Sequence, residues 1–271
     1  SCIDASLGYF VEEIGQTVET ACPPGLYQPR EGSASCLIAS PGYYVDINLG
    51  EGQRFSTPCP VGTYNLAEGG TSVESCELAD VGFYVINKGQ STQVPCDFGE
   101  YQPAQGQTSC VKADLGHYAS QTGLSYQTVC AQGTYQPNNG QSSCLAADVG
   151  YFVDTSAALE QTRCQAYKST LYNSSKSVDD CILDSDSDSL PDVMDNDDDG
   201  DGFNDSEDRF PLNPNEWIDS DNDGEGDNTD PDDDNDGWSD VEEKRQGTNP
   251  LDSSERPVDG FEFIVPGTKI S

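Results

Sequence analysis

The residues best suited to do chemistry are aspartates that recur at every second position between Asp184 and Glu243. With the spacing of calcium-binding loops, this stretch contains four loops, which start at Asp184, Asp197, Asp219 and Asp232. In such a loop, positions 1, 3 and 5 supply side-chain oxygens, position 7 supplies a backbone carbonyl, and position 12 closes the shell. Hard oxygen ligands in this number and flexibility favour calcium over magnesium.

The predicted ligands stand at positions 1, 3, 5, 7, 9 and 12 of each loop. The first loop has Asp184, Asp186, Asp188, Leu190, Asp192 and Asp195. The second loop has Asp197, Asp199, Asp201, Phe203, Asp205 and Asp208. The third loop has Asp219, Asp221, Asp223, Glu225, Asp227 and Asp230. The fourth loop has Asp232, Asp234, Asp236, Trp238, Asp240 and Glu243. We therefore expect about four calcium ions, one in each loop.

The alternative for an aspartate-rich run is a disordered, solvated acidic linker, which is the common outcome for a block of like charge. The spacing is maintained through all four loops, and Gly202, Gly224 and Gly237 stand at position 6, where the loop must turn sharply. Position 7 is aromatic in two loops, at Phe203 and Trp238. A linker needs none of these features, so the pattern favours calcium binding.

The loops form two pairs, because the members of each pair start 13 residues apart and the pairs are offset by 35 residues. The stretch from Asp184 to Asp252 resembles thrombospondin type 3 repeats in the cysteine-free form typical of bacteria and archaea. This resemblance implies loops that wrap calcium with little other core. Its ending, DDDNDGWSDVEEKRQGTNPLD, predicts a short helix over Asp240–Gln246, capped by Gly247. Ser189 and Pro191 depart from the pattern, so we expect the first loop to be the weakest site.

Charge and composition limit the partners of this chain. The 271 residues include 49 acidic and 12 basic side chains, and the formal net charge is -37. This balance argues against nucleic acid and anionic membrane as partners, since both require a cationic face. No window approaches the ~18 apolar residues of a transmembrane segment, so none is expected. The sequence opens without a charged and then apolar signal region, and we expect any secretion signal to have been removed.

Eleven cysteines precede the acidic stretch, with alternating long and short gaps that repeat with a basic period of 34 residues. A fixed period of this size is typical of a repeat array in which each unit contacts mainly its neighbours. Segments such as SCLIASPGYYV and CPPGLYQPREGSASC each contain a glycine, one residue and then an aromatic. Regular cysteines in a polar chain favour an oxidising extracellular compartment, secreted or cell-surface, where disulfides replace a large core.

The pattern C-x2-G-x-Y-Q-P-x2-G-x2-S-C resembles the ephrin-receptor-like cysteine-rich repeats and, more distantly, the first half-module of tumour necrosis factor receptors. The resemblance covers Ser1 to about Ile182 and implies small disulfide-rich β repeats, built from hairpins stacked in an elongated array. The disulfides that it implies are Cys22 with Cys36, Cys59 with Cys76, Cys96 with Cys110, Cys130 with Cys144, and Cys164 with Cys181. The family's second disulfide in each repeat has no cysteines here. Spacing alone leaves pairing across the long gaps open.

Four other residues have specific expectations. Cys2 is left without a partner, so the chain is a fragment of a longer array, the partner was removed by processing, or another subunit supplies it. Asn173 and Asn204 match the glycosylation acceptor pattern. His117 is the only histidine and occupies a slot that is aromatic in the other repeats. Serine, cysteine and zinc catalytic centres of the usual kinds therefore have almost no histidine to use, and we expect no enzyme.

The last residues, 256–271, are no longer rich in acidic side chains. Phe261, Phe263 and Val265 alternate with Glu262 and Ile264, which predicts one short β-strand. Such a strand either packs back on the calcium segment or pairs with the next copy of the chain. The second alternative, together with the open partner of the first cysteine, predicts a head-to-tail assembly.

The sequence therefore predicts three parts: a cysteine-rich β repeat array over residues 1–182, an irregular calcium-stabilised segment over 183–255, and a terminal strand or assembly tail over 256–271. The predicted function is an extracellular structural protein, a stalk or fibre subunit. A receptor-like or adhesive ectodomain, and the non-catalytic spacer of a larger secreted enzyme, are the alternatives.

Overall fold

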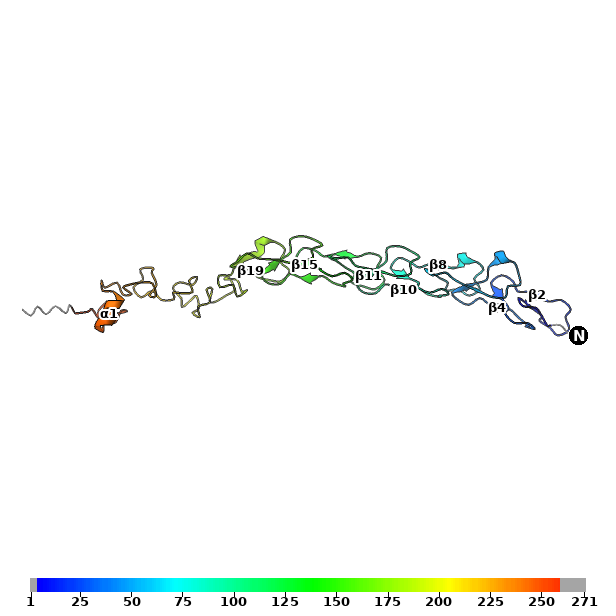
Figure 1. Ribbon diagram of the computed structural model, residues 1–271, viewed down its shortest axis with the longest axis horizontal. Coiled ribbons are helices and arrows are strands. Elements are labelled where there is room, and N and C mark those ends of the chain that lie inside the picture. Colours follow the sequence, from blue (N-terminus) through cyan, green and yellow to red (C-terminus); the bar gives the residue numbers. More distant parts are fainter. Residues whose placement is uncertain (1–3, 259–271) are drawn as a thin grey trace, which may run out of the picture. The chain divides into compact units, whose positions relative to one another are not determined.

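The computed structural model describes residues 4–258, which form two compact units. The first unit comprises most of the chain up to Asp148, together with Phe152–Thr162 and Asn173–Ser177. The second comprises Val149–Tyr151, Arg163–Tyr172 and the chain from Val178 onward. Figure 1 shows short strand pairs along the earlier part of the chain and helix α1 in the later part.

Every sheet in the described part of the chain is a two-stranded antiparallel hairpin formed by consecutive strands. The hairpins are β1 (Tyr9–Phe10) with β2 (Thr20–Ala21), β3 (Leu26–Tyr27) with β4 (Leu37–Ile38), β5 (Tyr43–Tyr44) with β6 (Thr57–Pro58), β7 (Thr63–Tyr64) with β8 (Glu77–Leu78), and β9 (Phe83–Tyr84) with β10 (Val94–Pro95). They continue with β11 (Glu100–Tyr101) and β12 (Val111–Lys112), β13 (His117–Tyr118) and β14 (Thr128–Val129), β15 (Thr134–Tyr135) and β16 (Leu145–Ala146), β17 (Tyr151–Phe152) and β18 (Thr162–Arg163), and β19 (Lys168–Thr170) and β20 (Cys181–Leu183). Short 3-10 helices lie at η1 (Ile47–Leu49), η2 (Val73–Ser75) and η3 (Val178–Asp180).

One buried small residue precedes the first strand of every hairpin, and it alternates between cysteine and alanine. The cysteines are Cys22, Cys59, Cys96, Cys130 and Cys164, and the alanines are Ala5, Ala39, Ala79, Ala113 and Ala147. All ten are at most 6% exposed. The two kinds of half-repeat therefore share one hairpin scaffold, and the expected fold of small disulfide-rich β repeats is confirmed.

Hairpins that start with cysteine are closed by a disulfide across the short gap. The five bonds are Cys22–Cys36, Cys59–Cys76, Cys96–Cys110, Cys130–Cys144 and Cys164–Cys181. In three of these hairpins, a buried glutamine ties the loop to its own base. Gln102 Nε2 donates to the carbonyl of Ser109 at 2.7 Å, and its Oε1 accepts from Ala104 N at 3.1 Å. The glutamine of the Y-Q-P motif therefore supports the disulfide from inside the loop.

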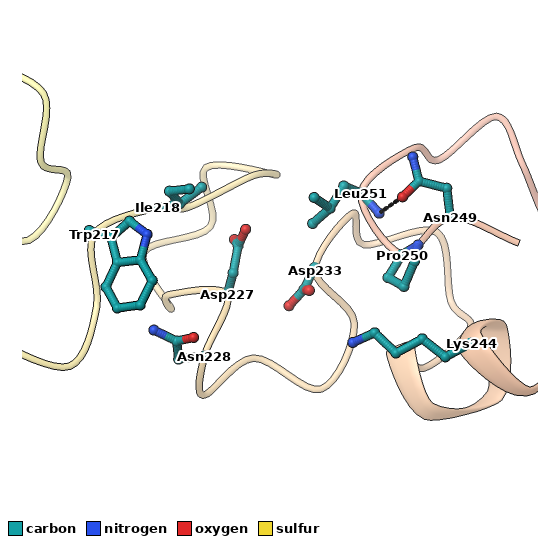
Figure 2. A pocket seen from close by; sticks show the side chains of 9 residues that line it. All are labelled: Trp217, Ile218, Asp227, Asn228, Asp233, Lys244, Asn249, Pro250 and Leu251. Atoms are coloured by element: carbon teal, nitrogen blue, oxygen red, sulfur yellow. Dashed lines mark hydrogen bonds between the residues drawn. The ribbon is translucent and has the colours of Figure 1, made fainter.

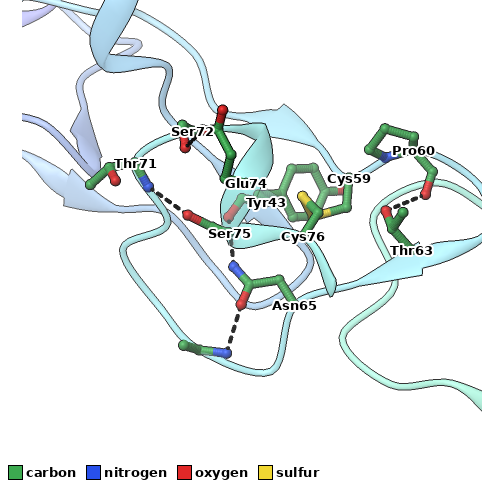
Figure 3. The surroundings of a disulfide bond; sticks show 11 residues. Tyr43, Cys59, Pro60, Thr63, Asn65, Thr71, Ser72, Glu74, Ser75 and Cys76 are labelled. Carbon is green, nitrogen blue, oxygen red and sulfur yellow. Dashed lines mark hydrogen bonds between the residues drawn. A yellow bond between two sulfur atoms is a disulfide. The ribbon is translucent and has the colours of Figure 1, made fainter. Parts of the chain in front are cut away.

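The Cys59–Cys76 hairpin has an asparagine at the glutamine position (Figure 3). Asn65 Oδ1 accepts from the N–H of Ala67 at 3.1 Å, and Thr63 Oγ1 donates to the carbonyl of Pro60 at 2.8 Å. The shorter side chain serves the same buried position, because Asn65 is as inaccessible to solvent as the glutamines.

Three of the hairpins that start with alanine have an aspartate–glutamine pair where the cysteine hairpins have a disulfide. In the β9–β10 hairpin, Gln93 stands fourteen residues after Ala79, the separation that joins Cys96 to Cys110. Gln93 Oε1 accepts from Asp80 N at 2.6 Å, and Gln93 Nε2 donates to Asp80 Oδ2 at 2.7 Å. Two further alanine hairpins repeat the pair with Asp114 and Gln127 and with Asp148 and Gln161.

Consecutive hairpins are joined by backbone hydrogen bonds that recur along the array. Between the β9–β10 and β11–β12 hairpins, Gly82 N donates to Gln102 O at 2.8 Å, Val85 N to Gln107 O at 2.9 Å, and Gly106 N to Ala79 O at 2.7 Å. The same three bonds reappear 34 residues later in the chain. Each hairpin is thus held mainly by its neighbours, as expected for a repeat array.

The second unit contains the β19–β20 hairpin, the irregular acidic loops and helix α1 (Asp240–Gln246). Ser239 caps the start of the helix by accepting from Glu242 N. Gly247 ends it in the left-handed conformation, at φ 82°, where glycine carries no steric penalty. The predicted helix and its cap are therefore confirmed. An aromatic stack supplies part of the sparse apolar packing, with the Phe203 and Trp217 rings 5.2 Å apart and nearly parallel.

Four sequence predictions concern single residues or the tail. His117 begins β13 at the register taken by Phe83 in β9, so it occupies the predicted aromatic slot. Asn173 lies exposed after β19, and its glycosylation stays a prediction. Cys2 and the predicted strand over Phe261–Val265 lie outside the described residues.

Candidate metal centres

Each of the four acidic loops gathers the carboxylates of positions 1, 3 and 5. The four groups are Asp184 with Asp186 and Asp188, Asp197 with Asp199 and Asp201, Asp219 with Asp221 and Asp223, and Asp232 with Asp234 and Asp236. Within a group, one oxygen from each residue lies within 4.8 Å of the others. Ionised carboxylates crowd together in this way only at an electrostatic cost, which a shared cation removes.

The backbone of each loop turns around the first and third carboxylates of its group. In the second loop, Gly202 N donates to Asp197 Oδ2 at 3.0 Å, and Phe203 N donates to Asp201 Oδ1 at 2.8 Å. The fourth loop repeats both bonds, from Gly237 to Asp232 and from Trp238 to Asp236. One oxygen of each of these carboxylates is therefore fixed by the backbone.

Other oxygens in the groups are buried and have no hydrogen-bond partner among residues 4–258. They are Asp184 Oδ1, Asp199 Oδ2, Asp201 Oδ2, Asp219 Oδ1, Asp221 Oδ2, Asp234 Oδ2 and Asp236 Oδ2. A buried carboxylate oxygen without a partner is costly, and several converging oxygens suit a hard divalent cation. The donor set in all four loops therefore fits calcium.

The first loop contributes one such oxygen, from Asp184, whereas each of the other three loops contributes two. Ser189 replaces the position-6 glycine and adopts φ 87°, a strained angle for a residue with a side chain. Pro191 is buried beside the loop. These observations agree with the expectation of a weaker first site, although its affinity stays a prediction.

Position 12 behaves differently in alternate loops. Asp208 and Glu243 are buried, and Asp208 Oδ2 and Glu243 Oε2 have no partner in the described part of the chain. Asp195 and Asp230 instead accept from the backbone of the next loop, at Asp197 N and Asp232 N, 3.1 and 2.9 Å away. Position 12 thus offers a free buried oxygen in the second loop of each pair and joins the two loops in the first.

Position 9 was assigned as a ligand from the spacing, and the structure places its carboxylates outside the groups of three. Asp192 accepts from both the N–H and the hydroxyl of Ser185, at 2.8 and 2.9 Å. Asp227 accepts from Ser220 in the same way. The corresponding bonds in the other loops come from the backbone at position 2, to Asp205 and Asp240. These carboxylates close the loop onto its own second residue.

Two aspartates at position 2 were not among the predicted ligands. Burial first, and then the charges of Asp205 and Asp192, raise the pKa of Asp198 to about 6. Burial first, and then the hydrogen bond and charge of Asp240, raise the pKa of Asp233 to about 7. Their only signal in the sequence is that each is the middle residue of three consecutive aspartates.

Glu216 is a further buried acid that the spacing does not reveal. It is 2% exposed, its Oε2 accepts from Asn228 N at 3.0 Å, and its Oε1 has no hydrogen-bond partner within the described chain. It lies in the segment between the two loop pairs, where no residue was predicted to face a cation. A buried carboxylate is costly without a nearby positive charge, so a cation in the third loop would also stabilise Glu216.

Neighbouring basic residues meet this demand only in part. Arg256 Nε lies 3.4 Å from Asp236 Oδ2, and Lys244 Nζ lies 2.9 Å from Asp240 Oδ2. From Asp184 to Glu255 the chain has 28 acidic residues and three basic residues. Most of this charge is therefore left for bound cations to neutralise.

Residues 232–253, which contain the fourth loop and helix α1, match the family model of the bacterial TSP3 repeat. No curated protein matches the chain. No helix within residues 4–258 is long and apolar enough to cross a membrane. The resemblance of the hairpins to ephrin-receptor-like repeats stays a prediction. The TSP3 match and the five disulfides together indicate a calcium-binding, extracellular structural role.

Proposed function

We propose that this chain is a structural stalk or fibre subunit that uses calcium as a permanent structural component. The observation that carries the proposal is the series of four carboxylate groups whose buried oxygens have no hydrogen-bond partner within the described chain. We assign one ion to each group, about four in all. The calcium holds a segment that has almost no apolar core.

The charge balance supports a structural use of calcium over a signalling use. The segment from Asp184 to Glu255 has a formal charge of -25, from 28 acidic and three basic residues. Four ions would contribute about eight positive charges, so the calcium-free segment would repel itself strongly. Extracellular modules typically bind calcium at ~10⁻⁴ to 10⁻³ M, and these sites would stay occupied outside cells.

The disulfide hairpins support a mechanical role. Five hairpins are closed by disulfides, and consecutive hairpins of the first unit are joined through backbone hydrogen bonds that use no large side chain. The array offers a single histidine, His117, whose ring contacts the carbonyl of Leu115. These features suit a non-catalytic spacer, and we include the absence of enzymatic activity in the proposal.

The finer part of the proposal is head-to-tail assembly of copies through residues 256–271. Its support is the alternating pattern of Phe261, Phe263 and Val265, together with the unassigned partner of Cys2. Deletion of residues 259–271 tests it. We expect the full chain to form polymers in calcium and the shortened chain to stay monomeric in electron micrographs. If the shortened chain forms the same polymers as the full chain, residues 259–271 do not mediate assembly.

The calcium part is tested separately by limited proteolysis with and without a chelator. We expect cleavage within residues 184–255 only after chelation, and cleavage of the hairpins only after reduction of the disulfides. The double variant Asp199→Asn and Asp201→Asn should be cleaved in the second loop at calcium concentrations that protect the parent chain. Glu207→Gln, an exposed acid in the same loop that lies outside the carboxylate group, is the matched control. Equal cleavage of the double variant and the control would contradict the assignment.

A further inference from the structure

A cavity of about 360 Å³ lies beside the fourth loop, between two apolar walls. Trp217 and Ile218 form one wall, and Pro250 and Leu251 form the other (Figure 2). The Trp217 ring is held in place because it stacks on Phe203 at 5.2 Å. Ile218 and Leu251 are about half exposed, so the walls are open to a partner from solvent. None of these residues is a predicted calcium ligand.

The floor of the cavity is acidic. Asp227 and Asp233 point into the space between the walls, and Lys244 approaches from below (Figure 2). Asp233 is only 5% exposed, and its Oδ1 has no hydrogen-bond partner within residues 4–258. The two oxygens of Asp227 already accept from Ser220. The cavity therefore contains one buried acceptor that requires a donor.

The local charge selects a cationic donor. Asp227, Asp233 and Asp240 face a single ammonium, that of Lys244, which is already 2.9 Å from Asp240 Oδ2. Acidic side chains therefore outnumber ammonium groups around the cavity by three to one. A buried carboxylate gains most from a donor that also carries positive charge, because such hydrogen bonds are about twice as strong as neutral ones.

We propose that this cavity binds the side chain of a lysine on a partner protein. The lysine ammonium donates to Asp233 Oδ1, and the aliphatic stem lies between Trp217 and Leu251. Lysine fits better than arginine because one carboxylate oxygen is available, whereas a guanidinium pairs best with both oxygens at once. The indole ring of Trp217 adds a cation–π attraction to the bound ammonium.

The walls connect this site to the acidic loops. Ile218 directly precedes the third loop, and Asp227 N donates to its carbonyl at 3.1 Å. Pro250 and Leu251 follow helix α1, which begins inside the fourth loop. The inference goes beyond the proposed structural function, and it requires calcium only because calcium orders the loops that carry the walls.

Calorimetric titration of the full chain tests the proposal, with the peptides acetyl-Leu-Lys-Leu-amide and acetyl-Leu-norleucine-Leu-amide. The titrations use saturating calcium, above the ~10⁻³ M upper range for extracellular modules. We expect the lysine peptide to bind at least about tenfold more tightly than the norleucine peptide, which lacks only the ammonium. Equal affinity of the two peptides, or no binding of either, would overturn the proposal.

Two variants locate the binding. Asp233→Asn should abolish the preference for lysine, whereas Asp198→Asn, the same change at the same position of the second loop, should leave it intact. Leu251→Ser changes no charge and should weaken both peptides equally. A calcium titration of each variant separates loss of the metal from loss of the peptide. If Asp233→Asn also loses calcium, Leu251→Ser becomes the deciding variant. Unchanged binding of the lysine peptide by Leu251→Ser would then overturn the site.

The chain's own residues 259–271 are a competing occupant, since they include Lys269 and several apolar side chains. A chain lacking these residues should bind the lysine peptide with unchanged affinity. An increase of about tenfold or more would show that the tail occupies the cavity and would replace the proposed partner with a segment of this chain. This outcome is distinguishable from failure of the structural proposal, which proteolysis measures independently.

Discussion

Gln93 and Asp80 hold the β9–β10 hairpin by two reciprocal hydrogen bonds, of 2.6 and 2.7 Å, at the place where the next hairpin has a disulfide. The pairs of Asp114 with Gln127 and of Asp148 with Gln161 repeat this arrangement in two later hairpins. Ala79 fills the first cysteine slot and Gln93 the second. From Ala79 to Cys181, a noncovalent closure therefore alternates with a covalent one.

The variant Gln93→Ala should destabilise the first unit by about 1 kcal/mol, because both bonds of a partly exposed pair are lost. Urea unfolding measures the change. The double variant Ala79→Cys and Gln93→Cys should form a sixth disulfide and stabilise the unit by about 3 kcal/mol, the value for a loop of this length. Two free thiols in that double variant, after air oxidation, would contradict the equivalence of the two hairpin types.

The β9–β10 and β13–β14 hairpins, which flank the β11–β12 hairpin, approach each other closely at Gly82. This approach requires a residue without a side chain. A Cβ atom there would lie 2.1 Å from the carbonyl oxygen of Gly123, and the residue has φ +83°. Gly82→Ala should therefore cost more than the ~1 kcal/mol of backbone strain alone. Gly15→Ala is the control, since Gly15 has a similar φ of +94° and no atom near the added carbon. Equal losses for the two variants in urea unfolding would show that the contact carries no energy.

Much of this architecture is predictable from spacing. The 34-residue period, the four acidic loops and the helix over Asp240–Gln246 all follow from residues at fixed separations. The pairing of Asp80 with Gln93 does not, because both are ordinary polar residues thirteen positions apart. Spacing also makes Asp192 a predicted ligand, but it does not predict that Asp192 accepts two hydrogen bonds from Ser185. Burial of Glu216 depends on how the third loop folds back, which no local pattern encodes.

The acidity of the second unit should make its stability depend on pH in opposite ways with and without calcium. The folded-state pKa values of Asp198 and Asp233, about 6 and about 7, lie above the ordinary value of 3.8. A raised acid pKa means that ionisation disfavours the folded state, so the calcium-free segment should become more stable as pH falls from about 7 to about 4. Circular dichroism of calcium-depleted protein across this range measures the change.

With calcium present, the effect of pH on these loops should reverse, because protons compete with the ion for carboxylates. The calcium concentration at half-saturation should rise as pH falls below about 6. The double variant Asp198→Asn and Asp233→Asn should flatten the pH dependence of the calcium-free protein. If the calcium-free segment instead loses structure steadily as the pH falls from 7 to 4, Asp198 and Asp233 are not buried as described.

Backbone amide exchange at the position-6 glycines tests the central claim most directly. The amides of Gly202, Gly224 and Gly237 each donate to the first carboxylate of their loop, at 3.0, 3.3 and 3.0 Å. If calcium orders these loops, the three amides should be protected in calcium and exchange at nearly the unfolded rate after chelation. The hairpin amide of Ala113, bonded to Gly99 O at 2.8 Å, should be protected in both conditions. Equal exchange of the three glycine amides with and without calcium would contradict the account.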